Sequence, residues 1–314
     1  MATMLDPDIQ RLLDTVFNVP AGTEAPDIAQ LRAAAETAPV LLGGEPEPVA
    51  SITDAFAPGE DDRSLPVRIY RPAAAELLPL LVYAHGGGWV TGSLESHDRL
   101  CRILANRLRV VLVAVAYRCA PEHVYPAALD DLEAAWRWAR GEAKSLGADG
   151  MRFAVAGDSS GGGLAAALTL RLRSDGAVQP NLQLLLYPAL DATCSRPSYR
   201  EFATGYSLSA GLMAWYWDAY RAGAAKSAVG LSPLAAADLS GLPPAVIAVA
   251  ECDVLRDDAL DYAARLEAAG IPVRVIRCTG MIHGFLRWTG AVPAAHRWIE
   301  AIADAGRAAL GKNA

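Results

Sequence analysis

The chain has 314 residues, of which 53% are hydrophobic and 20% charged, and its formal net charge is −7 at pH 7. This size and composition are typical of a globular protein with one large α/β domain plus decoration, or with two small domains. The negative charge and the lack of lysine or arginine runs argue against a nucleic-acid partner and against an anionic membrane surface.

The N-terminal residues 1–8 carry acids where a secretory signal would need a basic patch and an apolar core. No apolar run approaches the roughly 18 residues that are needed to span a bilayer. These two features predict a cytoplasmic protein. Five cysteines without a C-x-x-C pair argue against a disulfide framework and against zinc ligation, so buried free thiols are expected.

Residues 5–17 are predicted to form an amphipathic helix ahead of the main domain. Asp6 and Pro7 suit an N-cap followed by the first helical position, and apolar residues then recur near the helical period. Residues 20–48 hold five prolines among alanines and glycines. That composition predicts a loosely ordered connector with one short helix at about 27–36.

Eight strand-like stretches follow, and the first two suit an edge hairpin. Most of the others are continuously apolar, as expected of parallel strands covered on both faces, and helical patterns lie between them. This alternation favours an α/β fold with an eight-stranded, mostly parallel sheet and right-handed crossovers. The predicted strands are 49–56, 66–71, 80–84, 110–117, 153–156, 182–187, 245–250 and 273–278. The predicted helices between and after them are 95–107, 127–145, 161–173, 257–269 and 293–309.

The interval between Pro188 and Pro244 is too long for a simple crossover and holds a helical pattern at 209–221 but no convincing strand. Such a segment is a candidate lid. Ordinary packing of an extra surface helix is the alternative, because aromatic side chains usually serve a core first. The aromatic residues concentrated there are Tyr206, Trp215, Tyr216, Trp217 and Tyr220.

Residues 154–164 form an apolar run that breaks into glycine and serine and then becomes apolar again. The pattern Gly157-x-Ser159-x-Gly161 fits a strand, a sharp turn and a helix that expose a nucleophilic serine. The glycines suit a turn in which neighbouring backbones approach too closely for a Cβ. A glycine-rich turn without chemistry is the alternative. We predict Ser159 as the nucleophile.

A second glycine cluster, His-Gly-Gly-Gly-Trp at residues 85–89, follows the strand that ends at Ala84. It supplies consecutive backbone amides with no side chains to obstruct them. Acyl transfer needs such donors, because the tetrahedral intermediate carries negative charge on the former carbonyl oxygen. The pattern predicts an oxyanion hole from the N–H groups of Gly87, Gly88 and Ser160.

A serine hydroxyl needs a base to remove its proton and an acid to orient that base. In proteins with this strand–turn–helix arrangement around the serine, the catalytic residues follow the chain order serine, acid, histidine. Beyond the candidate acids lie His283 and His296. His296 falls inside the helical pattern 293–309, whereas His283 follows the last strand in the loop 280–285. We predict His283 as the base.

The candidate acids follow the strand that ends at Ala250. Asp257 and Asp258 suit the first turn of the next helix, where carboxylates favour the helix dipole without chemistry. Glu251 and Asp253 remain. Asp253 lies further past the strand end and is preferred, although spacing alone does not exclude Glu251.

The other histidines have weaker claims. His85 precedes the serine, so we expect it to shape its loop by hydrogen bonding, together with Gly86, rather than to act as a base. No H-E-x-x-H or comparable ligand cluster is present, so neither a metal nor another cofactor is indicated. The turn 157–163 lacks the signatures of a P-loop and of a dinucleotide-binding fold.

Seven short motifs occur in a fixed order along the chain. They are His85 to Trp89, Tyr117 to His123, Pro126 to Ala128, Gly157 to Gly162, Ser232 to Leu234, Leu242 to Pro244 and Met281 to Phe285. With them the chain resembles, over about residues 65–290, the hormone-sensitive-lipase-like bacterial esterases (family IV), α/β hydrolases that pair an HGGG loop with a G-D-S-A-G elbow. The resemblance implies a helical cap over the sheet. It also implies Asp253 as the triad acid, because this residue begins a D-x-L-R-D motif.

The resemblance further implies a division into an N-terminal cap segment at 1–48, a catalytic domain at 49–189 and 231–314, and a cap insertion at 190–230. The hypothesis is a serine carboxylesterase for short- to medium-chain acyl esters. A small-molecule ester is then the partner, and a homodimer is a family-level expectation. Amide hydrolysis and a ligand sensor on an inactive hydrolase fold are the alternatives.

Three residues depart from the family pattern. Ser160 replaces an alanine and places a second hydroxyl beside the nucleophile, where we expect it to alter the polarity of the pocket while its amide still donates. Gly163 replaces a frequent asparagine, and Val254 replaces a proline. None of these changes removes a reacting group.

Overall fold

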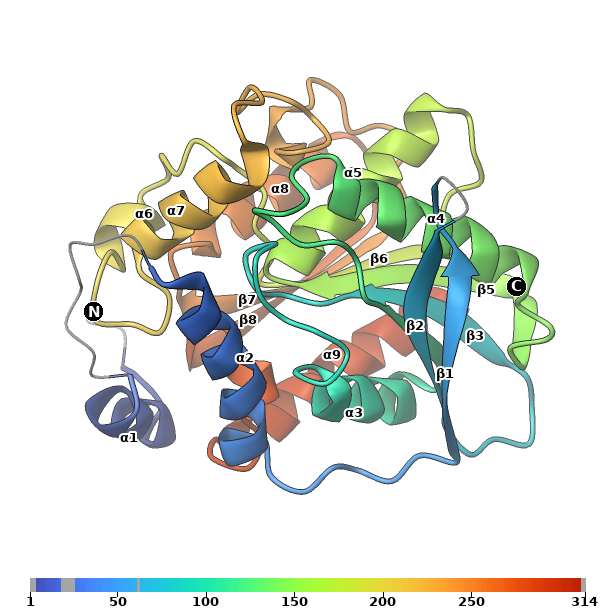
Figure 1. Ribbon diagram of the computed structural model, residues 1–314, viewed down its shortest axis with the longest axis horizontal. Coiled ribbons are helices and arrows are strands. Elements are labelled where there is room, and N and C mark those ends of the chain that lie inside the picture. The colour runs from blue at the N-terminus through green and yellow to red at the C-terminus, as the bar shows by residue number, and fades with distance from the viewer. Residues whose placement is uncertain (1–3, 18–25, 61–62, 312–314) are drawn as a thin grey trace.

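The computed structural model describes residues 4–17, 26–60 and 63–311. Its centre is an eight-stranded sheet in the order β1-β2-β4-β3-β5-β6-β7-β8 (Figure 1). β1 pairs antiparallel with β2, and β2 with β4, while the remaining neighbours are parallel. The α/β class and the eight-stranded, mostly parallel sheet predicted from the sequence are confirmed. The strands are β1 Ser51–Pro58, β2 Ser64–Arg71, β3 Leu78–Ala84, β4 Val111–Val115, β5 Ala148–Asp158, β6 Leu182–Leu186, β7 Ala245–Cys252 and β8 Val273–Ile282.

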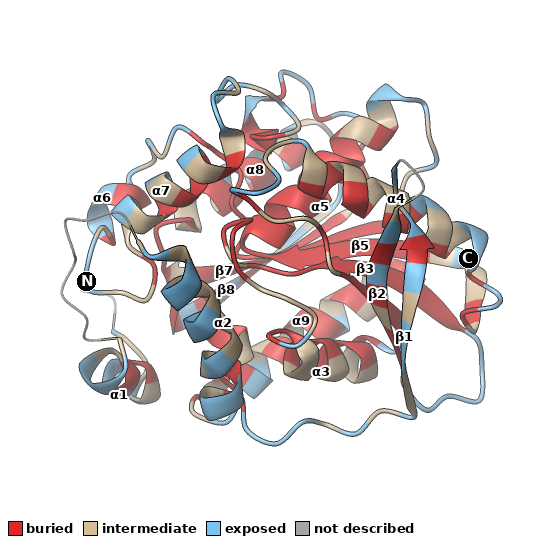
Figure 2. Ribbon diagram, viewed as in Figure 1, coloured by how far each residue is buried: buried red, intermediate tan, exposed pale blue. Residues whose placement is uncertain are grey.

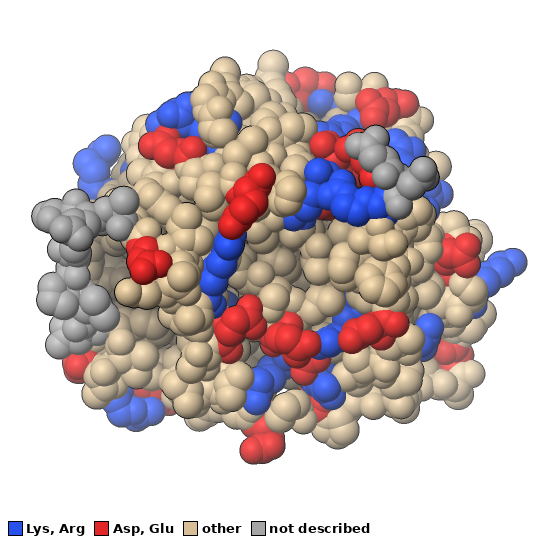
Figure 3. Space-filling view, viewed as in Figure 1, with Lys and Arg blue, Asp and Glu red and all other residues tan. Residues whose placement is uncertain are grey.

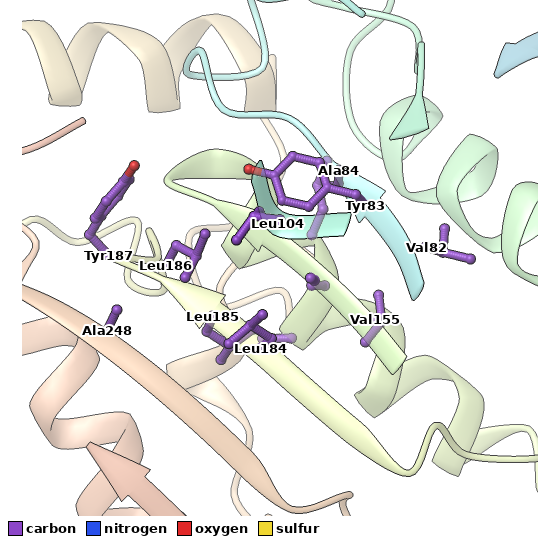
Figure 4. Close-up of a cluster of buried hydrophobic side chains, with 14 of the residues drawn as sticks. Val82, Tyr83, Ala84, Leu104, Val155, Leu184, Leu185, Leu186, Tyr187 and Ala248 are labelled. Carbon is purple, nitrogen blue, oxygen red and sulfur yellow. The ribbon is translucent and has the colours of Figure 1, made fainter. Parts of the chain in front are cut away.

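The central strands are buried on both faces, which explains their unbroken apolar sequences. Every residue of β3, β4 and β6 is buried, and the sheet forms the buried interior of the molecule in Figure 2. Side chains from β3, β5, β6 and β7 pack together there, among them Val82, Val155 and Leu184 (Figure 4). The strand predicted at 153–156 is the buried end of β5, which begins five residues earlier in a partly exposed stretch.

Helices cover both faces of the sheet. α3 and α9 lie on one face, and α4, α5 and α8 lie on the other (Figure 1). The predicted helices are all present, with ends that differ by a few residues. Their bounds are α3 Asp98–Leu108, α4 Ala127–Gly141, α5 Ser160–Ser174, α8 Arg256–Ala268 and α9 Ala294–Gly311.

The N-terminal segment contains two helices. α1 (Pro7–Thr15) begins as predicted, with Asp6 as N-cap accepting a hydrogen bond from the Asp8 amide. α2 (Ile28–Leu42) is longer than the predicted helix 27–36 and contains Pro39. The shorter prediction was wrong because a proline near the end of a helix deletes one backbone hydrogen bond and does not stop the last turn. Residues 20–25 of the predicted connector lie outside the described residues.

The segment between β6 and β7 holds α6 (Ser198–Glu201), the predicted helix as α7 (Ala210–Arg221) and a 3₁₀ turn, η2 (Pro233–Ala235). Some of its aromatic residues serve packing. Trp217 and Tyr220 are buried against Trp89, with ring centroids 4.2 Å and 4.6 Å away. This cluster fixes α7 to the loop that follows β3.

Within the described ranges, no helix combines the length and the apolar character that crossing a bilayer requires. The same residues include no group of three or more histidine, cysteine or acidic side chains arranged to hold a metal ion. The cysteines are free, and three of them are buried. Acidic and basic side chains are interspersed on the face shown in Figure 3 and do not gather into one basic patch.

Candidate active site

Ser159 lies at the sharp turn between β5 and α5. Its φ of 55° and ψ of −121° are strained for a residue with a side chain. The turn closes because its glycines lack a Cβ: one on Gly161 would lie 2.1 Å from the Ala84 carbonyl oxygen, and one on Gly157 would lie 2.3 Å from the Gly161 oxygen. The strained turn holds the serine at the wall of a cavity above the sheet.

Three side chains from distant parts of the chain form a continuous hydrogen-bonded line. The Oγ of Ser159 is 2.9 Å from Nε2 of His283, and Nδ1 of His283 is 2.7 Å from Oδ2 of Asp253. Asp253 is nearly fully buried, and its other oxygen accepts a hydrogen bond from the Leu255 amide at 3.0 Å. The arrangement can remove the serine proton while the carboxylate keeps the imidazole in one tautomer and orientation.

The pairing of β7 with β8 explains why Asp253 reaches His283. Cys252 pairs with Ile282, so the next residue of each strand leaves the sheet at the same place. Glu251 is directed elsewhere and accepts a hydrogen bond from the Gly280 amide at 2.8 Å.

The remaining acids and the second histidine take other roles. Asp257 and Asp258 lie in the first turn of α8, as predicted. Asp257 accepts a hydrogen bond from the Ser198 amide at 2.8 Å. His296 is on the exposed side of α9 and is not among the residues that line the cavity.

The glycine loop after β3 faces the serine across the cavity. Gly87 and Gly88 adopt φ values of 125° and 61°, which glycine tolerates. Their amides donate to no described residue, and the amide of Ser160, at the start of α5, has no acceptor within its helix. None of the three predicted donor amides has a backbone acceptor among the described residues, and Gly87 and Gly88 line the cavity, so the oxyanion hole stays a prediction. The ring of Tyr216 packs closely against Gly88: a Cβ on Gly88 would lie 2.2 Å from that ring.

A buried carboxylate that the sequence analysis did not single out holds this loop. Oδ1 of Asp158 accepts hydrogen bonds from the Gly86 amide at 2.8 Å and from the Tyr83 hydroxyl at 2.7 Å, and it lies 3.3 Å from Nε2 of His97. Burial would raise the pKa of Asp158, but the charge and hydrogen bond of His97 and the charge of Arg287 hold it below its usual value. The sequence did offer one signal for this contact, namely an acidic residue directly before the serine. Because β3 and β5 are neighbours in the sheet, that residue lies beside the start of the glycine loop.

His85 also stabilises the loop. Its Nδ1 lies 2.8 Å from the Gly86 carbonyl oxygen, and its ring stacks on Tyr117 at 4.2 Å. Burial lowers the pKa of His85 to about 3, so the ring stays neutral near pH 7. These contacts support a loop-shaping role for His85 and Gly86, which stays a prediction.

The cavity has a volume of about 220 Å³. Beneath it lie the glycine loop, Ser159 and His283, and its other walls come from α2, from the segment around α7 and from the turn η3 (Phe285–Arg287). Ser160 is fully buried and does not line it, so the expectation that its hydroxyl alters pocket polarity was wrong. The apolar lining residues are Phe17, Leu31, Ala34, Ala35, Ala38, Leu208, Leu212, Met213 and Trp288.

A sheet of this order with a strand–serine–helix elbow defines the class of α/β hydrolases, and comparison with known proteins agrees. A family model described as "alpha/beta hydrolase fold" matches residues 81–287. An ethyl acetate hydrolase of Pseudomonas putida is 38% identical over 86% of this chain and 86% of its own length. The carboxylesterase NlhH of Mycobacterium tuberculosis is 38% identical over 93% and 92%.

Solved structures agree as well. An ester hydrolase from the Lake Arreo metagenome, complexed with a bipyridine phosphonate derivative, is 39% identical with a TM-score of 0.92 over 98% of this chain and 100% of that one. A hyperthermophilic esterase from Pyrobaculum calidifontis is 35% identical, with a TM-score of 0.91 over 99% and 100%. The chain therefore belongs to the hormone-sensitive-lipase-like carboxylic ester hydrolases of the α/β-hydrolase fold.

Proposed function

We propose that this protein is a serine carboxylesterase that hydrolyses short- to medium-chain acyl esters through an acyl-enzyme intermediate. The observation that carries the proposal is the line from Ser159 through His283 to Asp253, with contacts of 2.9 Å and 2.7 Å. The cavity of about 220 Å³ is smaller than the pockets that usually enclose drug-sized ligands, which supports a small ester. The P. putida relative is named for such an ester, ethyl acetate.

In the first half-reaction, Nε2 of His283 takes the proton of Ser159 as Oγ attacks the ester carbonyl carbon. Asp253 stabilises the imidazolium that forms. The carbonyl oxygen becomes an oxyanion and accepts hydrogen bonds from the amides of Gly87, Gly88 and Ser160. His283 then gives the proton to the departing alkoxide, and the alcohol leaves.

In the second half-reaction, His283 removes a proton from water, and the resulting hydroxide attacks the acyl-enzyme carbonyl. The second tetrahedral intermediate uses the same amides. Its collapse breaks the bond to Ser159, whose Oγ recovers the proton from His283. The products are one carboxylic acid and one alcohol, and the enzyme returns to its starting protonation state.

The N-terminal segment 1–48 and the insertion 190–230 together form the cap of this proposal, over a catalytic domain made of 49–189 and 231–314. In Figure 1, α2 and α7 lie on the same side of the molecule. Both contribute residues to the cavity that contains Ser159. A cap of this kind limits the size of the acyl or alcohol group that reaches the serine.

The test compares Ser159→Ala with Ser160→Ala on p-nitrophenyl esters of increasing acyl length and with a serine-directed phosphonate. We expect Ser159→Ala to lose turnover and phosphonate labelling, and Ser160→Ala to keep both. Loss of turnover only in Ser160→Ala would overturn the nucleophile assignment. A wild-type protein without turnover would favour a ligand sensor on an inactive hydrolase fold. Faster cleavage of a matched anilide than of the ester would favour amide hydrolysis.

A further inference from the structure

A cation lines the cavity beside the candidate nucleophile. Arg287 ends the turn η3, four residues after His283, and lines the same cavity as Ser159. Its Nη2 lies 3.3 Å from the place that a Cβ on Gly284 would occupy, so the guanidinium is next to the residue that follows the histidine. Arginine side chains carry a positive charge in proteins.

Among the described residues, no carboxylate forms a salt bridge with Arg287, although its charge acts on Asp158. Nε of Arg287 is buried and has no hydrogen-bond partner among the described residues. The two carboxylates of the site are paired elsewhere, Asp158 with His97 and Asp253 with His283. A guanidinium presents five N–H donors, and leaving the buried Nε–H unpaired costs free energy.

The electrostatic effect of Arg287 reaches the cavity itself. Burial raises the pKa of Asp158, and the charge of Arg287, together with the charge and hydrogen bond of His97, opposes that rise. The charge of Arg287 also opposes the burial that raises the pKa of Tyr216. Asp158 and Tyr216 both line the cavity. A bound carboxylate in the same space would therefore be attracted to Arg287 and could accept two parallel N–H donors from it.

We propose that Arg287 is a specificity-determining residue that recognises a carboxylate on the substrate, so that the enzyme prefers small esters bearing a free carboxylate over neutral esters of the same shape. The inference rests on the proposed esterase function and names the substrate class of that same site. An overall charge of −7 would repel anionic substrates from the protein at long range. A cation at the cavity wall overcomes that repulsion only at short range, which suits selection after entry.

A competing explanation is that Arg287 only balances the buried charge of Asp158. The two explanations predict different effects of an Arg287 substitution on the hydrolysis of anionic and neutral esters. A counter-ion to Asp158 affects the glycine loop and thus every ester equally, whereas a carboxylate-binding residue affects the ratio between an anionic and a neutral ester.

The experiment measures kcat/KM by titration of released acid for two matched pairs. Monoethyl succinate is compared with ethyl levulinate, which replaces the carboxylate of the acyl part by a methyl ketone. O-acetyl-lactate is compared with O-acetyl-lactamide, which replaces the carboxylate of the alcohol part by an amide. The proteins are wild type, Arg287→Met, Arg287→Lys and, as a matched loss of one positive charge outside the cavity, Arg297→Met.

We expect the anionic-to-neutral ratio for at least one pair to fall about tenfold or more in Arg287→Met, mainly through KM, since a charge-assisted hydrogen bond is lost. Arg287→Lys should keep part of the ratio, and Arg297→Met should keep it all. In wild type the ratio should also fall as NaCl is added, because salt screens the attraction. The pair that responds shows which part of the ester carries the carboxylate.

An unchanged ratio in Arg287→Met for both pairs would overturn the proposal, and so would an equal fall for anionic and neutral esters. Normal hydrolysis of ethyl levulinate that is abolished by Ser159→Ala, without any preference for the anion, would refute this inference and leave the esterase function intact. If wild type hydrolysed none of the four esters, the proposed function and this inference would fail together.

Discussion

The carboxylate of Asp158 accepts a hydrogen bond from the backbone N–H of Gly86 at 2.8 Å. The residue before the candidate nucleophile thereby holds the loop that carries the candidate oxyanion donors Gly87 and Gly88. This contact joins the ends of β5 and β3, which are neighbours in the sheet. The distance between the candidate nucleophile and the candidate oxyanion donors thus depends on the Asp158 carboxylate.

Replacing Asp158 by asparagine keeps an acceptor for the Gly86 amide and removes the charge that pairs with His97. We expect kcat for p-nitrophenyl acetate to fall by about 10- to 100-fold with KM changed less than about threefold, because misaligned donors act on the transition state. Tyr83→Phe removes one hydrogen bond to Asp158 and leaves the Gly86 contact, so its loss should be smaller. Wild-type kcat in Asp158→Asn would show that the charge does not position the loop.

Gly88→Ala tests the close contact between the glycine loop and the insertion. A Cβ at Gly88 would lie 2.2 Å from the ring of Tyr216, and the φ of 61° disfavours a side chain. We expect a loss of at least about 100-fold in kcat, equivalent to about 2.7 kcal/mol or more of transition-state stabilisation. The matched control is Gly211→Ala in α7, where a Cβ meets nothing within 4 Å. That change should keep activity and slightly stabilise the helix.

Arg32 attaches α2 to the catalytic domain. Its guanidinium donates to the carbonyl oxygens of Val90 and Ala120 and forms an ion pair with Glu122 at 2.6 Å. Arg32→Ala should raise KM several-fold and speed proteolytic cleavage around α2, because it removes three contacts that hold α2 against the catalytic domain. Glu122→Gln should have a smaller effect, since the pair is exposed and the two carbonyl contacts remain. Equal effects would mean that the ion pair alone holds α2.

His85 should make the fold sensitive to mild acid. Burial lowers its pKa from 6.5 to about 3, so the folded protein keeps the ring neutral where the unfolded chain is protonated. Unfolding then takes up a proton below about pH 6.5, and the free energy of unfolding should decrease by up to about 1.4 kcal/mol per pH unit as pH falls toward 4.5. Urea titrations of wild type and His85→Gln check this.

His85→Gln should be less stable than wild type at pH 7, because the ring stacks on Tyr117, but its stability should change less between pH 6.5 and 4.5. The exposed His296→Gln is the control and should retain the wild-type slope. An identical slope in His85→Gln would assign the acid sensitivity to other groups.

Much of the fold was predictable because its signals are local. An apolar run such as 182–187 predicts a strand covered on both faces, and β6 is buried along its whole length. The Asp6 cap and the following proline marked the start of α1 correctly. The length of α2 was not predictable in this way, because its packing over the cavity outweighs the local preference of Pro39 to end a helix.

Some residues of the candidate site were likewise predictable from local sequence, and others required the tertiary structure. Chain order and glycine spacing were enough to choose Ser159, His283 and the glycine loop, since a sharp strand-to-helix turn requires glycines at fixed positions around the serine. The choice between Glu251 and Asp253 depended on the register of β7 with β8, which sends Glu251 to the Gly280 amide and Asp253 to the imidazole. The Asp158 contacts and the position of Arg287 also required the tertiary structure, because a hydrogen bond or an unpaired charge is a relation between segments far apart in the chain.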